Sequence, residues 1–233
     1  MSKVVILQSN YIPWKGYFDL IHDADVFIFY DEVKYTKNDW RNRNKIYTES
    51  GEHWLSIPIK KECVKLKISE VPIEDARWQE QHYKSILYGY KKAAHFSQIE
   101  ELLEDIYINR KWTNLSELNK YIIVKVSSML SITTLFKDSS EYDLSGERIQ
   151  KLINILKQEK ATEYISGPAA KDYLNGSENL FPDNGIKLTY KDYNGYLPYK
   201  QLKEPFNNYV SIIDILANIE LNEIKHHIWN GRL

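Results

Sequence analysis

The chain has 233 residues, of which 43% are hydrophobic and 27% are charged, a composition typical of a globular protein with a sizeable core. The formal net charge of −1 excludes a global electrostatic field that would gather nucleic acid or a membrane surface. A single cysteine, Cys63, excludes an internal disulfide framework and a multi-cysteine metal site, while 18 Tyr and 6 Trp favour a binding surface.

The amino-terminal sequence MSKVVILQSN contains only a very short apolar run, which argues against a signal peptide. No stretch approaches the ~20 apolar residues that cross a bilayer, so no membrane span is expected. The sequence therefore predicts a cytoplasmic protein in a reducing compartment, and it argues against nucleic acid as a partner.

The first predicted unit is strand–helix–strand. Val4–Leu7 and Val26–Tyr30 are apolar, partly β-branched runs typical of buried strands. Between them, Pro13 can start a helix whose apolar spacing runs through Tyr17 and Ile21. Parallel pairing of the two strands with a right-handed crossover is the default for such a unit.

The next part of the chain is less regular. Residues 31–45 lack a clear period and predict an ordered loop. His53–Ile59 alternates as a strand does, and Gly51 turns the chain before it. The alternation in Cys63–Ile68 predicts a half-exposed edge strand or hairpin partner. Helical spacing then predicts helices over Trp78–Tyr90, with Asp75 as a candidate N-cap, and over residues 97–108 and 115–130.

The second half repeats strands and helices. We expect strands at Ile132–Phe136, Tyr164–Ile165 and Ile186–Tyr190, and helices at Gly146–Gln158, Ala169–Leu174 and Val210–Asn218. The whole pattern predicts an α/β fold: a mixed or mostly parallel sheet flanked by helices, with a helical insertion at about 78–130 in the middle. No linker-like composition appears, so residues 1–233 are expected to form a single α/β domain.

Polar and aromatic residues follow the first strand at once: Gln8, Asn10, Tyr11 and Trp14. Ligands of open α/β sheets bind at the carboxyl ends of strands, and side-chain amides suit sugar hydroxyls or the polar ends of an amino acid. The alternative is that Gln8 and Asn10 satisfy backbone groups in a tight turn. The chain has neither G-x-G-x-x-G nor G-x-x-x-x-G-K-[ST], so any phosphate would have to be held by side chains.

The loop after the second strand carries the strongest local signal, Lys37 to Asn44. Arg41 and Arg43, two apart on an extended loop, would face one side and could hold a diphosphate bidentately. A base or a sugar face could stack on Trp40 or Tyr35. The alternative is a solvated basic loop with Trp40 as its hydrophobic anchor. The candidate substrate-binding residues are Gln8, Asn10, Tyr11, Trp14, Tyr35, Lys37, Trp40, Arg41, Asn42 and Arg43.

His82 on the predicted helix Trp78–Tyr90 is the candidate general base, because a neutral imidazole can accept a proton from an amine or a hydroxyl. Asp39 is its orienting partner or its alternative. The competing interpretation of His82 is a structural helix residue. Cys63 has no nearby His to activate it as a nucleophile. His226 and His227 lack metal-ligand spacing with any other residue, so no metal is predicted.

Hydroxyl clusters follow two further predicted strands, at Asp138-Ser139-Ser140 and Ser166-Gly167-Pro168. They could bind phosphate at strand ends, or they could cap the helices that start there. The sequence leaves both interpretations open.

The stretch QSNYIPWKGYFDLIHDADVFIFYDEVKYTKNDWRNRNKI resembles the signature of the WbqC-like family, a bacterial group from O-antigen and other surface-polysaccharide gene clusters. Ser9 and Ala94-His95 depart from the family's pattern, which tends to have Pro at the first position and Ala-Pro at the second. Further similar segments run along nearly the whole chain: Trp54–Pro58, Trp78 with His82, Tyr90 with Ala93, Asp138–Ser140, Tyr164–Gly167, Tyr199–Gln201 and Ser211–Leu216.

The resemblance implies that Gln8, Asn10, Tyr11, Trp14, Lys37, Asp39, Trp40, Arg41, Asn42, Arg43 and His82 form one site. It also implies an acyl or aminoacyl transferase, for example a glycyl transferase, acting on the amine of a nucleotide-linked amino sugar in lipopolysaccharide biosynthesis. The donor would be a thioester of CoA or of an acyl-carrier protein, which is then a partner, or an activated aminoacyl species. The alternative is a non-catalytic protein of the same pathway that binds a nucleotide sugar or a glycan.

Overall fold

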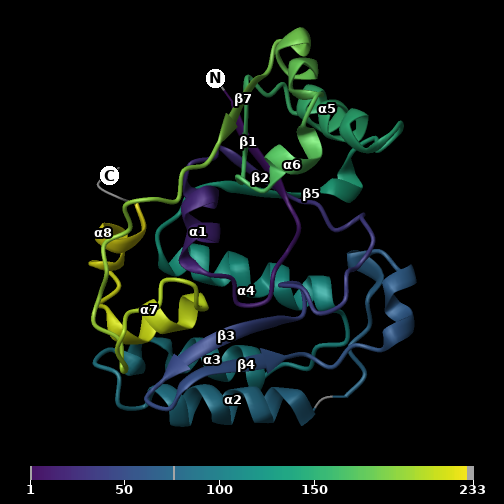
Figure 1. Ribbon diagram of the computed structural model, residues 1–233. Coiled ribbons are helices and arrows are strands. Elements are labelled where there is room, and N and C mark those ends of the chain that lie inside the picture. Colours follow the sequence, from purple (N-terminus) through teal and green to yellow (C-terminus); the bar gives the residue numbers. More distant parts are fainter. Residues whose placement is uncertain (1, 76, 230–233) are drawn as a thin grey trace.

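The computed structural model describes residues 2–75 and 77–229. Its upper part in Figure 1 is a five-stranded sheet in which every pairing is parallel. The strand order is β5-β2-β1-β6-β7. The strands are β1 (Lys3–Leu7), β2 (Val26–Phe29), β5 (Leu135–Asp138), β6 (Glu163–Ser166) and β7 (Lys187–Tyr190).

The chain builds this sheet in two directions from β1. It first adds β2 and β5 on one side and then returns to add β6 and β7 on the other side. The order therefore reverses between β1 and β6, which is the position where open α/β sheets form a ligand crevice at the carboxyl ends of their strands.

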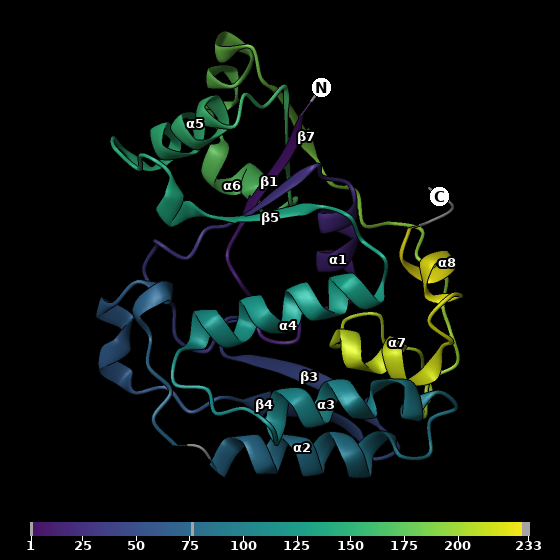
Figure 2. The same cartoon turned by 180° about the vertical axis from the view of Figure 1, so that it is seen from behind.

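Helices cover both faces of the sheet, as Figures 1 and 2 show from opposite sides. Helices α1 (Lys15–His22) and α4 (Leu115–Met129) lie on one face, and α5 (Arg148–Gln158) and α6 (Ala170–Leu174) lie on the other. Alternate residues of β1 feed two cores: Val5 joins the core with α1 and α4, while Val4 and Ile6 join the core with α5 and α6. Burial on both faces explains why β1 is a continuous apolar run.

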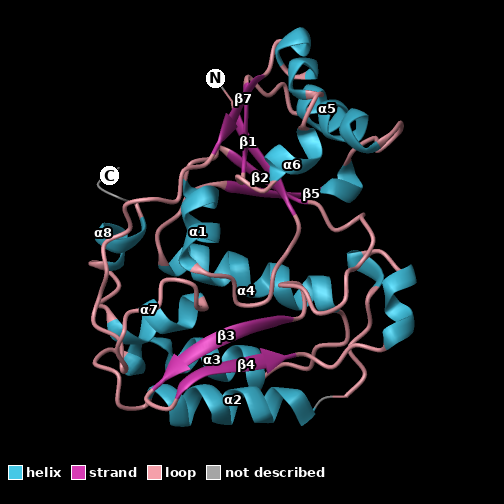
Figure 3. Ribbon diagram, in the orientation of Figure 1, coloured by secondary structure: helices cyan, strands magenta, loops and turns pink. Residues whose placement is uncertain are grey.

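The long connection from β2 to β5 forms the lower layers of the molecule (Figure 3). It contains an antiparallel hairpin, β3 (Arg43–Thr48) and β4 (Gly51–Ser56), followed by α2 (Arg77–Tyr90), α3 (Glu100–Tyr107) and α4. Gly51 has φ +109, a conformation that L side chains rarely adopt, so glycine suits the turn of this hairpin.

The last part of the chain closes one side of the molecule. An irregular connecting segment, residues 191–209, leads from β7 to α7 (Ile212–Asn218), which packs against β3 and the turn Phe96–Ile99. Helix α8 (Ile224–Ile228) then packs near α1. None of the helices in the described residues is both long and apolar enough to cross a membrane.

The predicted fold class is confirmed: a parallel sheet flanked by helices, with a helical segment in the middle. The first strand–helix–strand unit is parallel, as expected. The middle segment also contains the hairpin β3-β4, because the predicted loop 31–45 ends in a strand that begins at Arg43.

Two predicted elements were wrong or displaced. Cys63–Ile68 is not a strand: its residues belong to two short 3-10 turns, Lys61–Lys65 and Ile68–Glu70, and to a single bridge between them, because its backbone bonds to the loop after β2 at Val33 and Tyr35. The predicted strand Ile132–Phe136 starts later, at Leu135, because Ile132 still closes the end of α4 through its N–H to the Ser127 carbonyl.

Candidate functional site

Polar side chains gather at the carboxyl end of β1, next to the reversal of strand order. Gln8 and Asn10 follow β1 directly, and the neighbouring β6 ends at Ser166. The Ser166-Gly167-Pro168 segment therefore lies at the same end of the sheet as Gln8 and Asn10. The other predicted hydroxyl cluster, at residues 138–140, caps a turn, in which Asp138 accepts from the Ser140 N–H at 3.1 Å.

Arg41 reaches from the loop after β2 to this end of β1. Its Nη1 donates to Asn10 Oδ1 at 3.0 Å, and its Nη2 donates to Gln8 Oε1 at 3.2 Å. Its buried Nε has no hydrogen-bond partner within the described residues. Two neutral amide oxygens therefore orient the guanidinium, and the nearby Asp39 carboxylate, 3.6 Å from Nη1, compensates its charge only in part, which leaves it suited to binding an anion.

Asp39 stands beside this guanidinium, with its Oδ1 3.6 Å from Arg41 Nη1 and its side chain 31% exposed. The carboxylate is fixed by the Trp40 N–H at 2.7 Å and the Thr36 hydroxyl at 2.6 Å. The preceding Asn38 has φ +58, a left-handed conformation that Asn tolerates. The loop thus holds a partly exposed carboxylate next to a partly uncompensated arginine.

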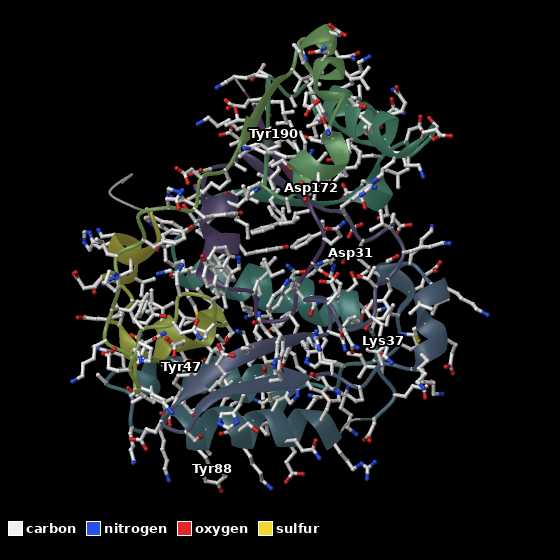
Figure 4. All side chains as sticks on the ribbon, viewed as in Figure 1. Asp31, Lys37, Tyr47, Tyr88, Asp172 and Tyr190 are labelled. Carbon is white, nitrogen blue, oxygen red and sulfur yellow. The ribbon has the colours of Figure 1, made fainter. Side chains whose placement is uncertain are left out.

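A buried carboxylate anchors the strand-end loop from behind. Asp31, two residues beyond the end of β2, lies between the sheet and α4 (Figure 4) and is fully buried. It accepts from the Ser9 N–H at 2.8 Å, the Ser9 hydroxyl at 2.7 Å and the Ser116 hydroxyl of α4 at 2.5 Å. These charge-assisted bonds fix Ser9, and with it the flanking amides that hold Arg41.

The backbone just beyond Asn10 is strained. Ile12 is a buried β-branched residue with φ +36, which is a genuine outlier for this residue type. Asn44 of β3 holds it there, because its Nδ2 donates to the carbonyls of Tyr11 at 3.1 Å and Ile12 at 2.9 Å. Such strain costs about 1–3 kcal/mol and is concentrated at functional sites.

A pocket of about 230 Å³ opens beside this loop. Its walls are three aromatic rings and two amides, with one proline between them: Trp14, Trp40, Tyr209, Asn10, Asn44 and Pro13. Aromatic faces with a few convergent amides suit the apolar faces and hydroxyls of a sugar ring.

The connecting segment 191–209 supplies the outer aromatic wall of this pocket. The Trp14 ring meets Tyr193 at 5.1 Å, Tyr209 at 5.5 Å and Tyr196 at 6.1 Å between ring centroids. Trp14 is therefore fixed by three tyrosines from one distant segment, and Tyr209, 66% exposed, forms the open rim.

Tyr11 and His82 lie in a separate buried cluster beneath the pocket. The Tyr11 hydroxyl is 2.7 Å from His82 Nδ1 and 2.6 Å from the Tyr107 hydroxyl, and Trp78 packs edge-on against His82. His82 also has a hydrogen bond to the Ser56 backbone, and burial lowers its pKa to about 4. His82 is 5% exposed and does not line the pocket, so the structure does not bring it to the ligand-binding surface.

The remaining predicted residues are divided between core and surface. Asn42 is buried and donates to the Ile57 carbonyl, while Tyr35 is buried with its pKa raised to about 12 by burial. Lys37 is exposed on the loop (Figure 4). Arg43 lies on β3 with its guanidinium over Trp54, outside the pocket. The structure thus brings together Gln8, Asn10, Trp14, Asp39, Trp40 and Arg41.

Comparison with known proteins places this chain in a family. The WbqC-like protein family matches residues 8–226. The chain belongs to the WbqC-like family. A family relative, the "Uncharacterized protein Rv1507c" of Mycobacterium tuberculosis (strain ATCC 25618 / H37Rv), is 44% identical over 220 residues, which cover 94% of each chain. No solved structure matches.

Sequence reasoning missed a buried charged cluster behind the pocket of this WbqC-like chain. Lys15, next to Trp14, is 3% exposed, and its Nζ lies 4.8 Å from the Tyr196 ring centroid and 5.2 Å from that of Tyr199. Burial lowers the pKa of Lys15 to about 8, against the opposing influence of Asp214.

Asp214 is the acidic member of this cluster and is fully buried on α7. It accepts from the hydroxyls of Tyr199 at 2.7 Å and Tyr90 at 3.0 Å and from Gln201 Nε2 at 2.7 Å. Burial raises its pKa to about 6. The cluster connects segment 191–209 to α7 and so stabilises the aromatic wall of the pocket. In the sequence, a single Asp within the apolar run of residues 210–218 was the feature that could have predicted this buried charge.

Within residues 2–75 and 77–229, no three or more His, Cys, Asp or Glu side chains are grouped so that they could hold a metal ion.

Proposed function

We propose that this WbqC-like protein binds a nucleotide-linked amino sugar at the carboxyl end of β1. One observation carries the proposal: Arg41, held by the amide oxygens of Gln8 and Asn10, stands at the reversal of strand order beside an aromatic-walled pocket. An arginine whose hydrogen bonds go to neutral amides, with the Asp39 carboxylate 3.6 Å away, supports binding of a phosphate, and the aromatic pocket supports binding of a sugar.

The parts of such a ligand match parts of the site. The diphosphate would meet Arg41, with Lys37 contributing from the exposed loop. The sugar would lie against Trp14 and Trp40, with its hydroxyls reaching Asn10. The absence of a glycine-rich phosphate loop is consistent with this side-chain mode of binding.

We further propose that the reaction is transfer of an acyl or aminoacyl group to the amine of that sugar in surface-polysaccharide biosynthesis. A C–N bond forms, the bond from the acyl carbon to the leaving group of a thioester or activated aminoacyl donor breaks, and protons leave the attacking ammonium. We assign proton removal to Asp39, because its carboxylate is partly exposed beside Arg41 whereas His82 is buried and hydrogen-bonded to Tyr11.

The second candidate is a protein that binds the same sugar nucleotide or a glycan without transferring a group. The burial of His82 favours this candidate, since the imidazole has no opening to the pocket.

Titration calorimetry with a panel of UDP- and dTDP-linked amino sugars tests the binding proposal, and failure of every panel member to bind would contradict it. Mass spectrometry of the polysaccharide repeat unit separates the two candidates. A repeat unit lighter by one acyl or amino-acid residue in cells that carry Asp39→Asn supports transfer. An unchanged repeat unit in cells lacking the protein altogether supports binding alone.

A further inference from the structure

Two tryptophans stand exposed on the hairpin side of the pocket. Trp40 is 44% exposed and Trp54 is 48% exposed, and their rings stack with centroids 5.8 Å apart at an interplanar angle of 29°. Isolated exposed apolar residues are common, but a stacked pair of large rings beside a pocket marks a recognition surface.

An arginine lies on this pair without a carboxylate partner. The guanidinium carbon of Arg43 is 4.5 Å from the Trp54 ring centroid. No carboxylate of the described chain lies within 4 Å of it, whereas the neighbouring Lys45 pairs with Glu52 at 2.9 Å. Stacking holds the guanidinium in place by a cation–π contact and leaves its N–H edge available for an anion.

The tryptophan pair also joins two hollows. Trp40 lines the pocket at the end of β1, and Trp54 lines a groove of about 460 Å³ between the hairpin and α2. Hydroxyl and imidazole groups in this groove come from Thr48, Ser50, His53 and Ser85, and Tyr88, at the outer side of α2 in Figure 4, forms its rim. The groove also has one carboxylate, Glu49, which is neutralised by Lys92 at 2.8 Å. The surface lined by aromatic and polar groups is therefore longer than a single sugar.

We propose that Trp40, Trp54 and Arg43 form a second subsite that binds an acidic oligosaccharide, which would be the growing glycan next to the sugar nucleotide. This inference rests on the proposed function. The C–H faces of successive sugars pack on the indole rings, a carboxylate or phosphate of the chain binds Arg43, and hydroxyls reach the polar groups of the groove.

A glycan array that contains neutral and acidic oligosaccharides of equal length tests the subsite. We expect binding to acidic members, weakened about tenfold or more by Arg43→Gln, because one lost charge-assisted contact is worth about that factor. A similar loss is expected for Trp54→Ala, which removes both the face for the sugar and the ring that holds Arg43. Trp54→Phe keeps an aromatic ring and should retain most of the binding. Arg148→Gln is the matched control, since Arg148 lies 4.6 Å from the Tyr173 ring on the other side of the sheet.

Absence of binding to every acidic member, equal binding to neutral members, or full binding by Trp54→Ala would overturn the proposal. Thermal unfolding of each variant checks that its fold is kept. The same variants are titrated with the sugar nucleotides: Trp54→Ala should keep that affinity, whereas Arg41→Ala should lose it and keep array binding. The array and the titration therefore test the second subsite and the sugar-nucleotide site independently, so that one proposal can be contradicted without the other.

Discussion

Asn10 and Tyr11 are neighbours in the chain, yet they belong to two different clusters. Asn10 lines the pocket and binds Arg41, while Tyr11 is fully buried and binds His82 and Tyr107. The two clusters contain the same kinds of residues, polar groups among aromatic rings. What separates them is access to solvent: the first has a partly exposed carboxylate, Asp39, beside an arginine whose hydrogen bonds go to neutral amides, and the second is closed. Polar and aromatic residues in a sequence thus indicate a binding site only where the fold leaves their side chains accessible to solvent.

The closed cluster still serves the open one. His82, Tyr11 and Tyr107 form a hydrogen-bonded chain that joins α2 and α3 to the loop after β1. Asn44 adds the bond that holds Ile12 in its left-handed conformation. The buried cluster therefore fixes the backbone of the loop at Tyr11, and Asp31 fixes it at Ser9.

The largest effect is expected from Asp31→Ala, which removes the anchor of the strand-end loop. It leaves the Ser9 N–H and the hydroxyls of Ser9 and Ser116 without their acceptor in a buried place. We expect a loss of roughly 3 kcal/mol or more in the free energy of unfolding, measured with urea. The exposed Asp172→Ala, on α6, is the control and should change it by under about 0.5 kcal/mol. Equal effects of the two would contradict the anchoring role.

The second effect concerns the pH dependence of stability at His82. Burial lowers the pKa of His82 from its ordinary 6.5 to about 4, so the unfolded chain binds the proton more readily than the folded chain. The contribution of neutral, buried His82 to the free energy of unfolding is therefore complete above about pH 6.5 and is lost as the pH falls toward 4; its full size is roughly 3 kcal/mol. The stability difference between the wild type and His82→Phe should therefore narrow by about 2–3 kcal/mol from pH 7 to pH 4.5.

Urea unfolding at the two pH values measures this difference, and the subtraction removes the other titrating groups. A difference that does not change with pH would mean that His82 titrates normally, as a solvent-accessible general base would. That outcome would erase the distinction between the closed and the open cluster.

The smallest effect is expected at the rim of the open cluster. Tyr209→Ala removes a ring that is 66% exposed and touches Trp14 at a centroid distance of 5.5 Å. A lost stacking contact is worth about 1 kcal/mol, so affinity for a bound sugar nucleotide should fall roughly fivefold. Leu197→Ala, equally on the connecting segment and 55% exposed, should leave the affinity unchanged. A matching loss in both variants would assign the effect to the segment and not to the ring.

Local patterns predicted most of the fold. The apolar runs of β1 and β2 and the helical spacing of α2 and α4 are strong, regular signals, and the sheet class follows from their order. The hairpin strand β3 was missed because Arg43, Asn44 and Lys45 carry polar side chains that hide the pattern of a strand, although its partner β4 follows at once in the chain. The alternation in Cys63–Ile68 suggested a strand, but Leu66 and Ile68 bond to the backbone of Tyr35 and Val33, partners about 30 residues away that no local pattern reveals.

The candidate site was predictable in part for a similar reason. The position of Gln8 and Asn10 after a buried strand, and the density of cations in the next loop, pointed to the end of β1. Whether a side chain such as Tyr35 or His82 faces solvent or the core depends on distant segments, which no local pattern reveals. Tyr209, which lines the pocket beside Trp14, lies almost 200 residues further along the chain, so no pattern near Trp14 predicts it.

Titration calorimetry of wild type, Arg41→Ala and Arg110→Ala with a bound UDP- or dTDP-linked amino sugar tests the central claim most directly. Arg110 is a surface arginine paired with Asp105 at 2.9 Å and serves as the control. Loss of the Arg41 contact should weaken the affinity by roughly 10- to 100-fold, and Arg110→Ala should leave it within about twofold. Unchanged affinity in Arg41→Ala would contradict the claim that the guanidinium at the end of β1 binds the nucleotide sugar.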